Sequence, residues 1–116
     1  LFVSAKTLQT RRATVEKFLR AYRRGAAEYA TAFLRHDRYG KRRSGPPAQA
    51  AAAAIARYVY PGNPSGAAMV EAGAYFVYAQ ARLDTADIAR QVEWYQAQGL
   101  IDKNFTAQDV VDLSFK

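Results

Sequence analysis

The stretch that decides the fold is TRRATVEKFLRAYRRGAAEYATAFL, residues 10–34 of the 116-residue chain. Its apolar residues recur at steps of three and four, which is the period of a helix with one apolar face. That stripe consists of Val15, Phe18, Leu19, Tyr22, Ala26, Tyr29 and Phe33. Another face carries the basic residues Lys17, Arg20 and Arg24. The pattern predicts one long helix over 10–34 that ends near Arg35 or His36.

The segments on either side of this helix carry different signals. Before it, Leu1–Lys6 is a short apolar run that predicts one strand, although no second strand-like segment follows to pair with it. After it, residues 36–47 (HDRYGKRRSGPP) are polar, basic and rich in Gly and Pro, so they predict a surface loop. Pro46-Pro47 can open the next helix, which the alanine-rich sequence predicts over Ala48–Val59.

The remaining helices are predicted from capping signals. Asn63 before Pro64 predicts the start of a short helix that ends at about Ala72, with Gly73 closing it. A second start signal is Asp84-Thr85-Ala86-Asp87, which resembles a capping box, and Gly99 is placed to end that helix. A third is Thr106-Ala107-Gln108-Asp109.

The fold class expected from these signals is mainly α, with four or five helices and one short N-terminal strand. Residues 1–116 form a single helical domain or a fragment of a larger one. Four aromatic residues are expected to pack in its interior, and they are Tyr22, Phe33, Trp94 and Tyr95. If Trp94 is buried, its truncation to alanine costs about 3–5 kcal/mol.

Composition excludes several kinds of site. The chain has no cysteine, which excludes disulfides, thiol chemistry and zinc sites built on thiolate. It has one histidine, His36, so a His-rich metal site or a Ser-His-Asp triad has little to be built from. No apolar run approaches the roughly 20 residues of a membrane-spanning helix. The expectation is a protein that is not an enzyme and has no catalytic residues, no metal site and no cofactor.

The individual polar residues support that expectation. His36-Asp37 would act as an acid–base pair only if a substrate reached the loop, and a histidine after a helix more often satisfies its last carbonyls. The remaining acidic candidates are Glu71, Asp84, Asp87 and Glu93, which no spacing pairs as a hydrolytic dyad. The glycines match neither phosphate-loop nor dinucleotide patterns. Aromatic residues at 75, 76, 78, 94 and 95 could line a pocket, but such residues are usually core.

Charge is distributed unevenly along the chain. Residues 1–58 contain 13 Lys/Arg and 3 Asp/Glu, whereas residues 59–116 contain 4 and 7. The basic residues of 11–43 are Arg11, Arg12, Lys17, Arg20, Arg23, Arg24, Arg35, Arg38, Lys41, Arg42 and Arg43. They are numerous enough to neutralise several phosphates, although no helix-turn-helix, zinc-finger or RRM signature accompanies them. One alternative is therefore a stand-alone basic helical module that binds nucleic acid or an acidic protein partner through residues 11–43.

The C-terminal third carries a family resemblance. The run from Leu83-Asp84 through Trp94-Tyr95-x-Ala97-Gln98-Gly99-Leu100-Ile101 resembles the end of a periplasmic substrate-binding protein of the nitrate/sulfonate/taurine (NMT1-like) type, which serves ABC importers. Residues 110–115 (VVDLSF) resemble that family's closing segment. Upstream, Leu1-Phe2-Val3-Ser4 and the helix through Phe18–Tyr22 are similar in order and pattern to the strand and helix that precede it.

Two departures accompany this resemblance. Arg11-Arg12 stand where the family often has Pro-Glu, and Tyr78-Ala79-Gln80-Ala81 stand where it often has an Asp-Pro-Asp-Gly turn. The second change removes the sequence that forms the turn, while the helix start at Asp84 remains.

The resemblance implies a function without bond chemistry. This chain would be the C-terminal portion of a two-lobe α/β periplasmic-binding-protein fold that captures a small molecule and delivers it to an ABC importer. Its partners would be the small-molecule ligand, the importer's membrane subunits and the missing lobe of the same chain, and its location would be periplasmic. No signal peptide is visible, and a chain that begins at Leu1 is expected to be processed, engineered or a fragment. None of the family's ligand motifs matches residues here, so the ligand-binding residues are left unassigned.

Overall fold

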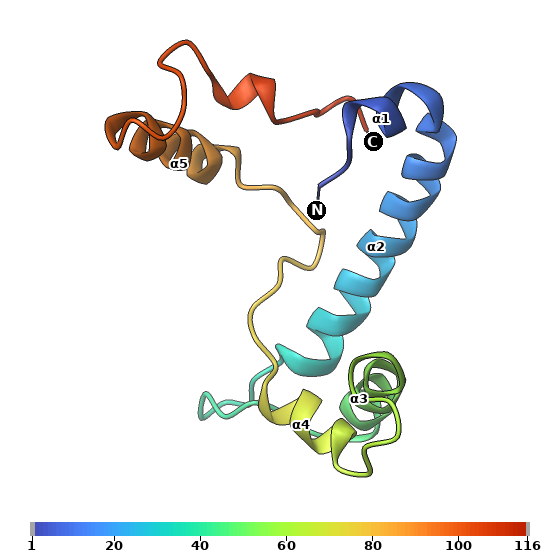
Figure 1. The fold of residues 1–116 in the computed structure, drawn as a ribbon. Coiled ribbons are helices and arrows are strands. Elements are labelled where there is room, and N and C mark those ends of the chain that lie inside the picture. Colours follow the sequence, from blue (N-terminus) through green and yellow to red (C-terminus); the bar gives the residue numbers. More distant parts are fainter. Residues whose placement is uncertain (1, 116) are drawn as a thin grey trace. The chain divides into compact units, whose positions relative to one another are not determined.

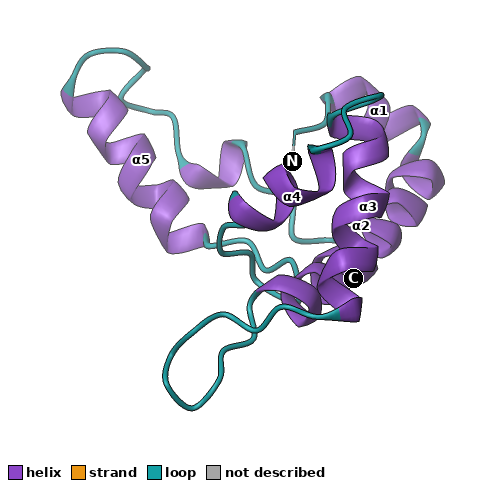
Figure 2. Ribbon diagram, turned by 90° about the horizontal axis from the view of Figure 1, so that it is seen from below, coloured by secondary structure: helices purple, strands orange, loops and turns teal. Residues whose placement is uncertain are grey.

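The computed structural model describes residues 2–115. These residues form five α-helices and one 3-10 turn, and Figure 2 draws them as helix and loop alone. The only ladder within 2–115 is an isolated antiparallel bridge between His36 and Arg42. The prediction of a mainly α fold with four or five helices is confirmed. The chain divides into two compact units, one that ends at Ala81 and one that begins at Arg82.

The predicted N-terminal strand is wrong. The structure has helix α1 at Ala5–Thr10 instead, and residues 2–4 precede it without a strand partner. The Ser4 hydroxyl accepts a hydrogen bond from the Thr7 N–H over 3.2 Å and so caps the start of this helix. The local cap therefore decides the conformation, because no neighbouring strand offers a ladder. Leu1, the first residue of the predicted strand, lies outside the described residues.

The long helix is present as α2, Arg12–Phe33. It begins two residues later than predicted because Arg11, with φ −135°, separates it from α1. It ends at Phe33, before the predicted Arg35 or His36. The cause lies in the next segment, where the Arg35 carbonyl accepts a hydrogen bond from the Arg43 N–H over 2.8 Å. That bond pairs Arg35 with the segment that precedes α3, so Arg35 does not continue the helix; Figure 1 shows α2 followed by this loop.

Helices α3 and α4 lie against each other and against the end of α2. Helix α3, Pro46–Val59, opens on Pro46 as predicted, and Ala48, Ala52 and Ala56 are its buried residues. Helix α4, Gly66–Ala72, ends at Gly73 as predicted. Its predicted cap is wrong, because the Asn63 carboxamide accepts from the Ser65 N–H over 2.9 Å and forms a turn that precedes the helix.

The core of the first unit is small. It consists of Ala32, Phe33, Ala48 and Ala52, with partly buried neighbours Tyr29, Leu34, Ala51, Ile55, Ala67, Val70 and Ala74. Phe33 is only 1% exposed, which confirms the prediction that it packs in the interior. Tyr22 is 42% exposed, so its predicted interior position is wrong.

A turn closes the first unit. The Ala81 N–H donates to the Tyr78 carbonyl over 2.8 Å, and Ala81 adopts φ +51°. A turn is therefore formed at the place where the family's Asp-Pro-Asp-Gly sequence is absent.

The second unit contains helix α5, Thr85–Ala97, with both predicted ends confirmed. The Asp84 carboxylate accepts from the Asp87 N–H over 3.0 Å. Gly99 adopts φ +69° and, with Leu100 N–H bonded to the Tyr95 carbonyl over 2.9 Å, ends the helix in a Schellman motif. The start signal at Thr106 is also confirmed as a capping box, but it opens a single 3-10 turn, η1, Ala107–Asp109.

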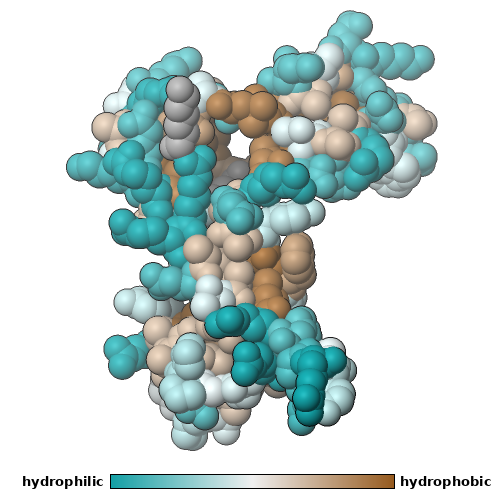
Figure 3. Space-filling view, turned by 180° about the vertical axis from the view of Figure 1, so that it is seen from behind, coloured by the Kyte–Doolittle hydropathy of each residue, from teal (hydrophilic) through white to brown (hydrophobic). Residues whose placement is uncertain are grey.

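No residue of 82–115 is fully buried. Trp94 is 56% and Tyr95 43% exposed, with their rings in an edge-to-face contact 5.1 Å apart. The prediction that these two residues pack in an interior is wrong for this chain, because no second layer of structure covers α5 within its unit. Apolar side chains consequently reach the surface, as the brown patches of Figure 3 show.

Candidate functional site

The basic segment between α2 and α3 folds as a hairpin over residues 35–43, which is called the basic hairpin below. The Asp37 N–H donates to the Lys41 carbonyl over 2.9 Å, and the Arg43 N–H donates to the Arg35 carbonyl. Gly40 occupies the turn with φ +76°, a conformation that favours glycine. The Asp37 carboxylate accepts from the N–H groups of Tyr39 and Lys41 over 2.8 and 3.0 Å. The hairpin is thus fixed by its own backbone and by one side chain.

All of the hairpin's charged side chains are exposed. At its tip, Tyr39 is 77% exposed, and the Arg38 guanidinium lies 4.7 Å from the centre of the Tyr39 ring. Among the described residues, no ion pair includes a cation of this hairpin. The hairpin therefore presents fixed positive charge to solvent.

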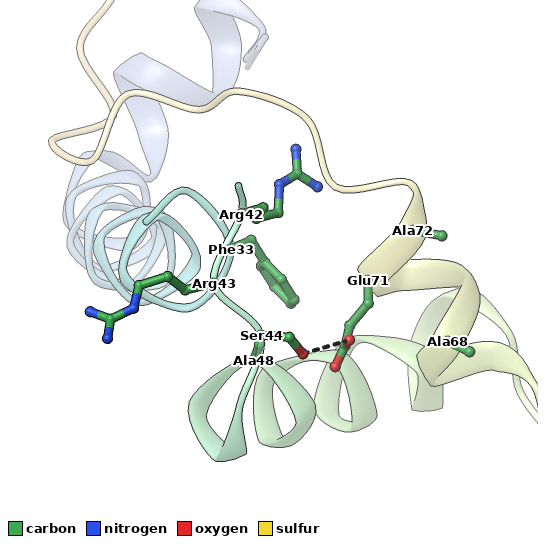
Figure 4. A pocket seen from close by; sticks show the side chains of 8 residues that line it. All are labelled: Phe33, Arg42, Arg43, Ser44, Ala48, Ala68, Glu71 and Ala72. Carbon is green, nitrogen blue, oxygen red and sulfur yellow. Dashed lines mark hydrogen bonds between the residues drawn. The ribbon is translucent and has the colours of Figure 1, made fainter. Parts of the chain in front are cut away.

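An open pocket of about 350 Å³ lies beside the hairpin (Figure 4). Its apolar lining is Phe33, Ala48, Ala68 and Ala72, and its polar lining is Arg42, Arg43, Ser44 and Glu71. The Ser44 hydroxyl donates to the Glu71 carboxylate over 3.3 Å. Figure 4 shows the Arg42 and Arg43 side chains on opposite sides of the backbone segment that carries them.

The pocket can hold a small molecule through one apolar floor, two arginines and one carboxylate. It is open to solvent, so a ligand there keeps much of its hydration, and the geometry favours weak binding. The Ser44 hydroxyl donates to the carboxylate of Glu71, which lies 27 residues away in the sequence. No histidine is among the residues that line this pocket.

His36 and Asp37 do not form an acid–base pair, in line with the interpretation that favoured a structural role. Asp37 is occupied by two backbone N–H groups, and His36 is exposed in the bridge opposite Arg42. The last turn of α2 is closed by the Leu34 N–H, which bonds to the Ala30 carbonyl over 3.0 Å.

The acidic candidates Glu71, Asp84 and Asp87 make structural contacts. Glu71 accepts from Ser44, Asp84 caps α5, and Asp87 binds Arg90 over 3.0 Å and Gln91 over 2.7 Å. No group of three or more potential metal ligands occurs within 2–115. None of the helices described is both long and apolar enough to cross a membrane.

The only pKa shift in the described chain with a clear cause belongs to Asp109. Hydrogen bonds from the Thr106 backbone N–H and from the Thr106 hydroxyl, over 2.6 and 2.8 Å, lower the pKa of this exposed carboxyl. The first of these is one of the two bonds of the capping box, and the second links the two side chains, so both hold the start of η1 and the lowered pKa is a local structural effect.

The sequence patterns did not predict two features of the site. The first is the pairing of Arg35 with Arg43 across the hairpin, and the second is the Ser44–Glu71 hydrogen bond. The hairpin had a readable signal, since Asp37-Arg38-Tyr39-Gly40 has Asp at the first and Gly at the fourth position of a β-turn. The Ser44–Glu71 contact joins residues 27 apart and has no local signal.

Comparison with known proteins adds no further information on identity. No family model matches the chain, and no curated protein or solved structure does so.

Proposed function

We propose that this chain is part of a solute-binding protein that captures a small molecule non-covalently and delivers it to an ABC importer. Two lobes would close on the ligand about a hinge, and no covalent bond would form or break. The two-lobe α/β fold, the periplasmic location and the importer partner all belong to this proposal, and they follow from the resemblance.

The observation that carries the proposal is the uncovered middle of the α2 stripe. Phe18 is 55% and Tyr22 42% exposed, and their rings stack 6.5 Å apart at an interplanar angle of 14°. The same stripe is buried on either side of them, at Val15 and at Ala26 and Phe33. An apolar face interrupted in this way is what a helix presents when another part of its protein normally covers it.

The capping residues of α5 also support the proposal. Asp84 and Gly99 lie at the two ends of the segment that carries the most specific part of the resemblance. Asp84 caps the start of α5, and Gly99 ends it in a left-handed conformation, as the residue types of the resembling pattern lead us to expect. The exposed Trp94 and Tyr95 belong to this segment and are further candidates for contact with a missing lobe.

The first test is to read the coding DNA upstream of the Leu1 codon. An open frame of about two hundred further residues that begins with a secretory signal supports the proposal, since two lobes need that length. A start codon directly before Leu1 contradicts it.

The second test measures association. The upstream polypeptide, expressed separately, is titrated with the 116-residue chain, and binding is followed by calorimetry. Phe18→Ser with Tyr22→Ser is expected to weaken association by more than tenfold, which corresponds to more than about 1.4 kcal/mol. Tyr58→Ser with Val59→Ser is the matched control, because Tyr58 and Val59 are 88% and 57% exposed on α3 and belong to no stripe of α2. Equal effects in both variants would contradict the role of the stripe.

A second candidate is the stand-alone basic module that binds nucleic acid or an acidic protein through residues 11–43. Ten of its eleven cations are exposed, and only Arg23 is partly buried. A DNA titration at two salt concentrations separates the two functions. A nucleic-acid-binding module should bind the DNA and lose affinity steeply as the salt concentration rises. A transporter fragment should associate with the DNA only weakly.

A further inference from the structure

The basic hairpin concentrates charge in a way that the proposed function does not use. It contains five Lys/Arg and one carboxylate, that of Asp37. That carboxylate is bound to two backbone N–H groups of the turn. It therefore forms no salt bridge with the cations of the hairpin. An unpaired cation keeps its full attraction for an external anion.

The ladder of the hairpin sorts these cations onto two faces. The bridge pairs His36 with Arg42, so the neighbouring pair is Arg35 with Arg43. Cross-strand partners lie on the same face, and successive residues alternate. Arg35 and Arg43 accordingly line one open pocket of about 300 Å³, together with Thr31 and Ser44. Two arginines in the lining of one small opening suit a phosphate, because a guanidinium can bind a phosphate with two N–H donors.

The tip of the hairpin adds an aromatic residue. Tyr39 is 77% exposed and carries the Arg38 guanidinium over its ring. Tyrosine is enriched at membrane–water interfaces, where the ring contacts apolar chains and the hydroxyl stays hydrated.

We propose that the basic hairpin docks on a membrane surface that contains anionic phospholipids. Arg35 and Arg43 bind a head-group phosphate, and Tyr39 lies at the level of the head groups. Because each basic residue near an anionic surface adds to the attraction, the cations on both faces and at the tip contribute together. The inference goes beyond solute capture and does not depend on it.

The geometry favours a lipid surface over nucleic acid. Proteins that bind single strands without sequence preference line a basic groove with several aromatic residues, on which successive bases stack. The hairpin has one aromatic residue, Tyr39, and one side of its ring is covered by Arg38. A flat array of phosphates requires only a protruding and rigid cationic tip.

The test is a flotation assay of the 116-residue chain with phosphatidylcholine vesicles that contain about a quarter phosphatidylglycerol. The chain should float with these vesicles and not with pure phosphatidylcholine. Arg35→Gln with Arg43→Gln should lower the partition coefficient by about tenfold or more. Arg20→Gln with Arg24→Gln, which removes the same charge from an exposed face of α2, should lower it less than about threefold. Far-UV circular dichroism confirms that both variants keep their helix content.

Other outcomes would overturn the proposal. Equal losses in the two double variants mean that net charge alone drives binding. Displacement from vesicles by sodium phosphate, but not by sodium chloride of equal ionic strength, means that the hairpin is a site for a free anion. Tighter binding to a single-stranded oligonucleotide than to the anionic vesicles, lost in the Arg35/Arg43 variant, assigns the surface to nucleic acid.

Discussion

The backbone N–H of Tyr75 donates a hydrogen bond to the Tyr29 hydroxyl over 3.0 Å, and the two rings lie 6.1 Å apart. This contact ties the segment after α4 to the end of α2, across 46 residues of sequence. It holds the chain over the small core, whose largest fully buried side chain is Phe33.

Removing the Tyr29 hydroxyl should loosen this segment. Tyr29→Phe deletes the acceptor and leaves the Tyr75 N–H to water, which should cost about 0.5–1.5 kcal/mol in the free energy of unfolding. Urea denaturation followed by circular dichroism measures the loss. Tyr58→Phe is the control, since the Tyr58 ring is exposed on α3, and it should leave the midpoint unchanged. Matching losses in the two variants would argue against the contact.

Phe33 should be the most costly aromatic residue to truncate. Phe33→Ala is expected to lower the free energy of unfolding by about 3–5 kcal/mol, because it leaves a cavity between α2 and α3. Phe18→Ala, on the exposed part of the same helix, should cost less than about 1 kcal/mol. Equilibrium unfolding of both proteins gives the comparison, and a larger cost at Phe18 would refute this placement of the core.

Two glycines should respond in opposite directions to alanine. A Cβ at Gly66 would lie 2.9 Å from the Tyr60 Cβ and 3.2 Å from the Ala56 Cβ, so Gly66→Ala should destabilise the chain by about 1–3 kcal/mol. A Cβ at Gly25 meets nothing within 4 Å in the middle of α2. Gly25→Ala should therefore stabilise by about 0.5–1 kcal/mol. Thermal midpoints of the two variants should lie on opposite sides of the parent value.

The single tryptophan should report an open environment. Trp94 is 56% exposed, so acrylamide should quench its fluorescence efficiently in the folded 116-residue chain. Protection comparable to that of a buried indole would contradict the exposed position. If the upstream polypeptide covers α5, its addition should reduce the quenching constant, and a Trp94→Phe chain supplies the background signal.

Asp109 should titrate below the ordinary pKa of an aspartate. The Thr106 N–H and hydroxyl stabilise its charged form, so its contribution to stability is complete above the ordinary aspartate pKa and is lost as pH falls through the lowered value. Carbon-detected NMR titration of the side-chain carboxyl measures the shift. Thr106→Val removes the hydroxyl and should raise the pKa of Asp109; no change on substitution would leave the capping box without effect.

Local signals predicted more of this fold than periodicity did. Pro46, Asp84 and Gly99 each fix a helix end through their own backbone or side chain, and each stands where its residue type indicates. Residues 2–6 were misassigned because apolar composition suits a strand equally well, and only the Ser4 cap distinguishes the helix. The Asn63 side chain forms a turn three residues before the helix begins at Gly66, and the sequence is compatible with either a turn or a cap at this position.

Exposure was the property least accessible from sequence. The spacing of Phe18, Tyr22 and Trp94 predicts a buried face, but burial also needs a second surface, and none is supplied within their units. The basic loop was located correctly, whereas its hairpin register depends on the Arg35–Arg43 backbone bond between residues eight apart. The Ser44–Glu71 contact requires the tertiary fold itself.

The buried face of α3 restricts which side chains can replace its alanines. Ala48, Ala52 and Ala56 stand at every fourth position and are at most 8% exposed. A single methyl group fills each of these places, so the helix is kept close to its neighbours by small size and not by complementary shape. Substitution by glycine or serine is tolerated there far better than any gain of bulk, and a saturation scan of the three positions should reveal an upper limit on side-chain volume. Ala48, Ala52 and Ala56 are therefore the alanines of α3 that should resist substitution, whereas Ala50, Ala53 and Ala54 of the same helix are exposed and should tolerate it.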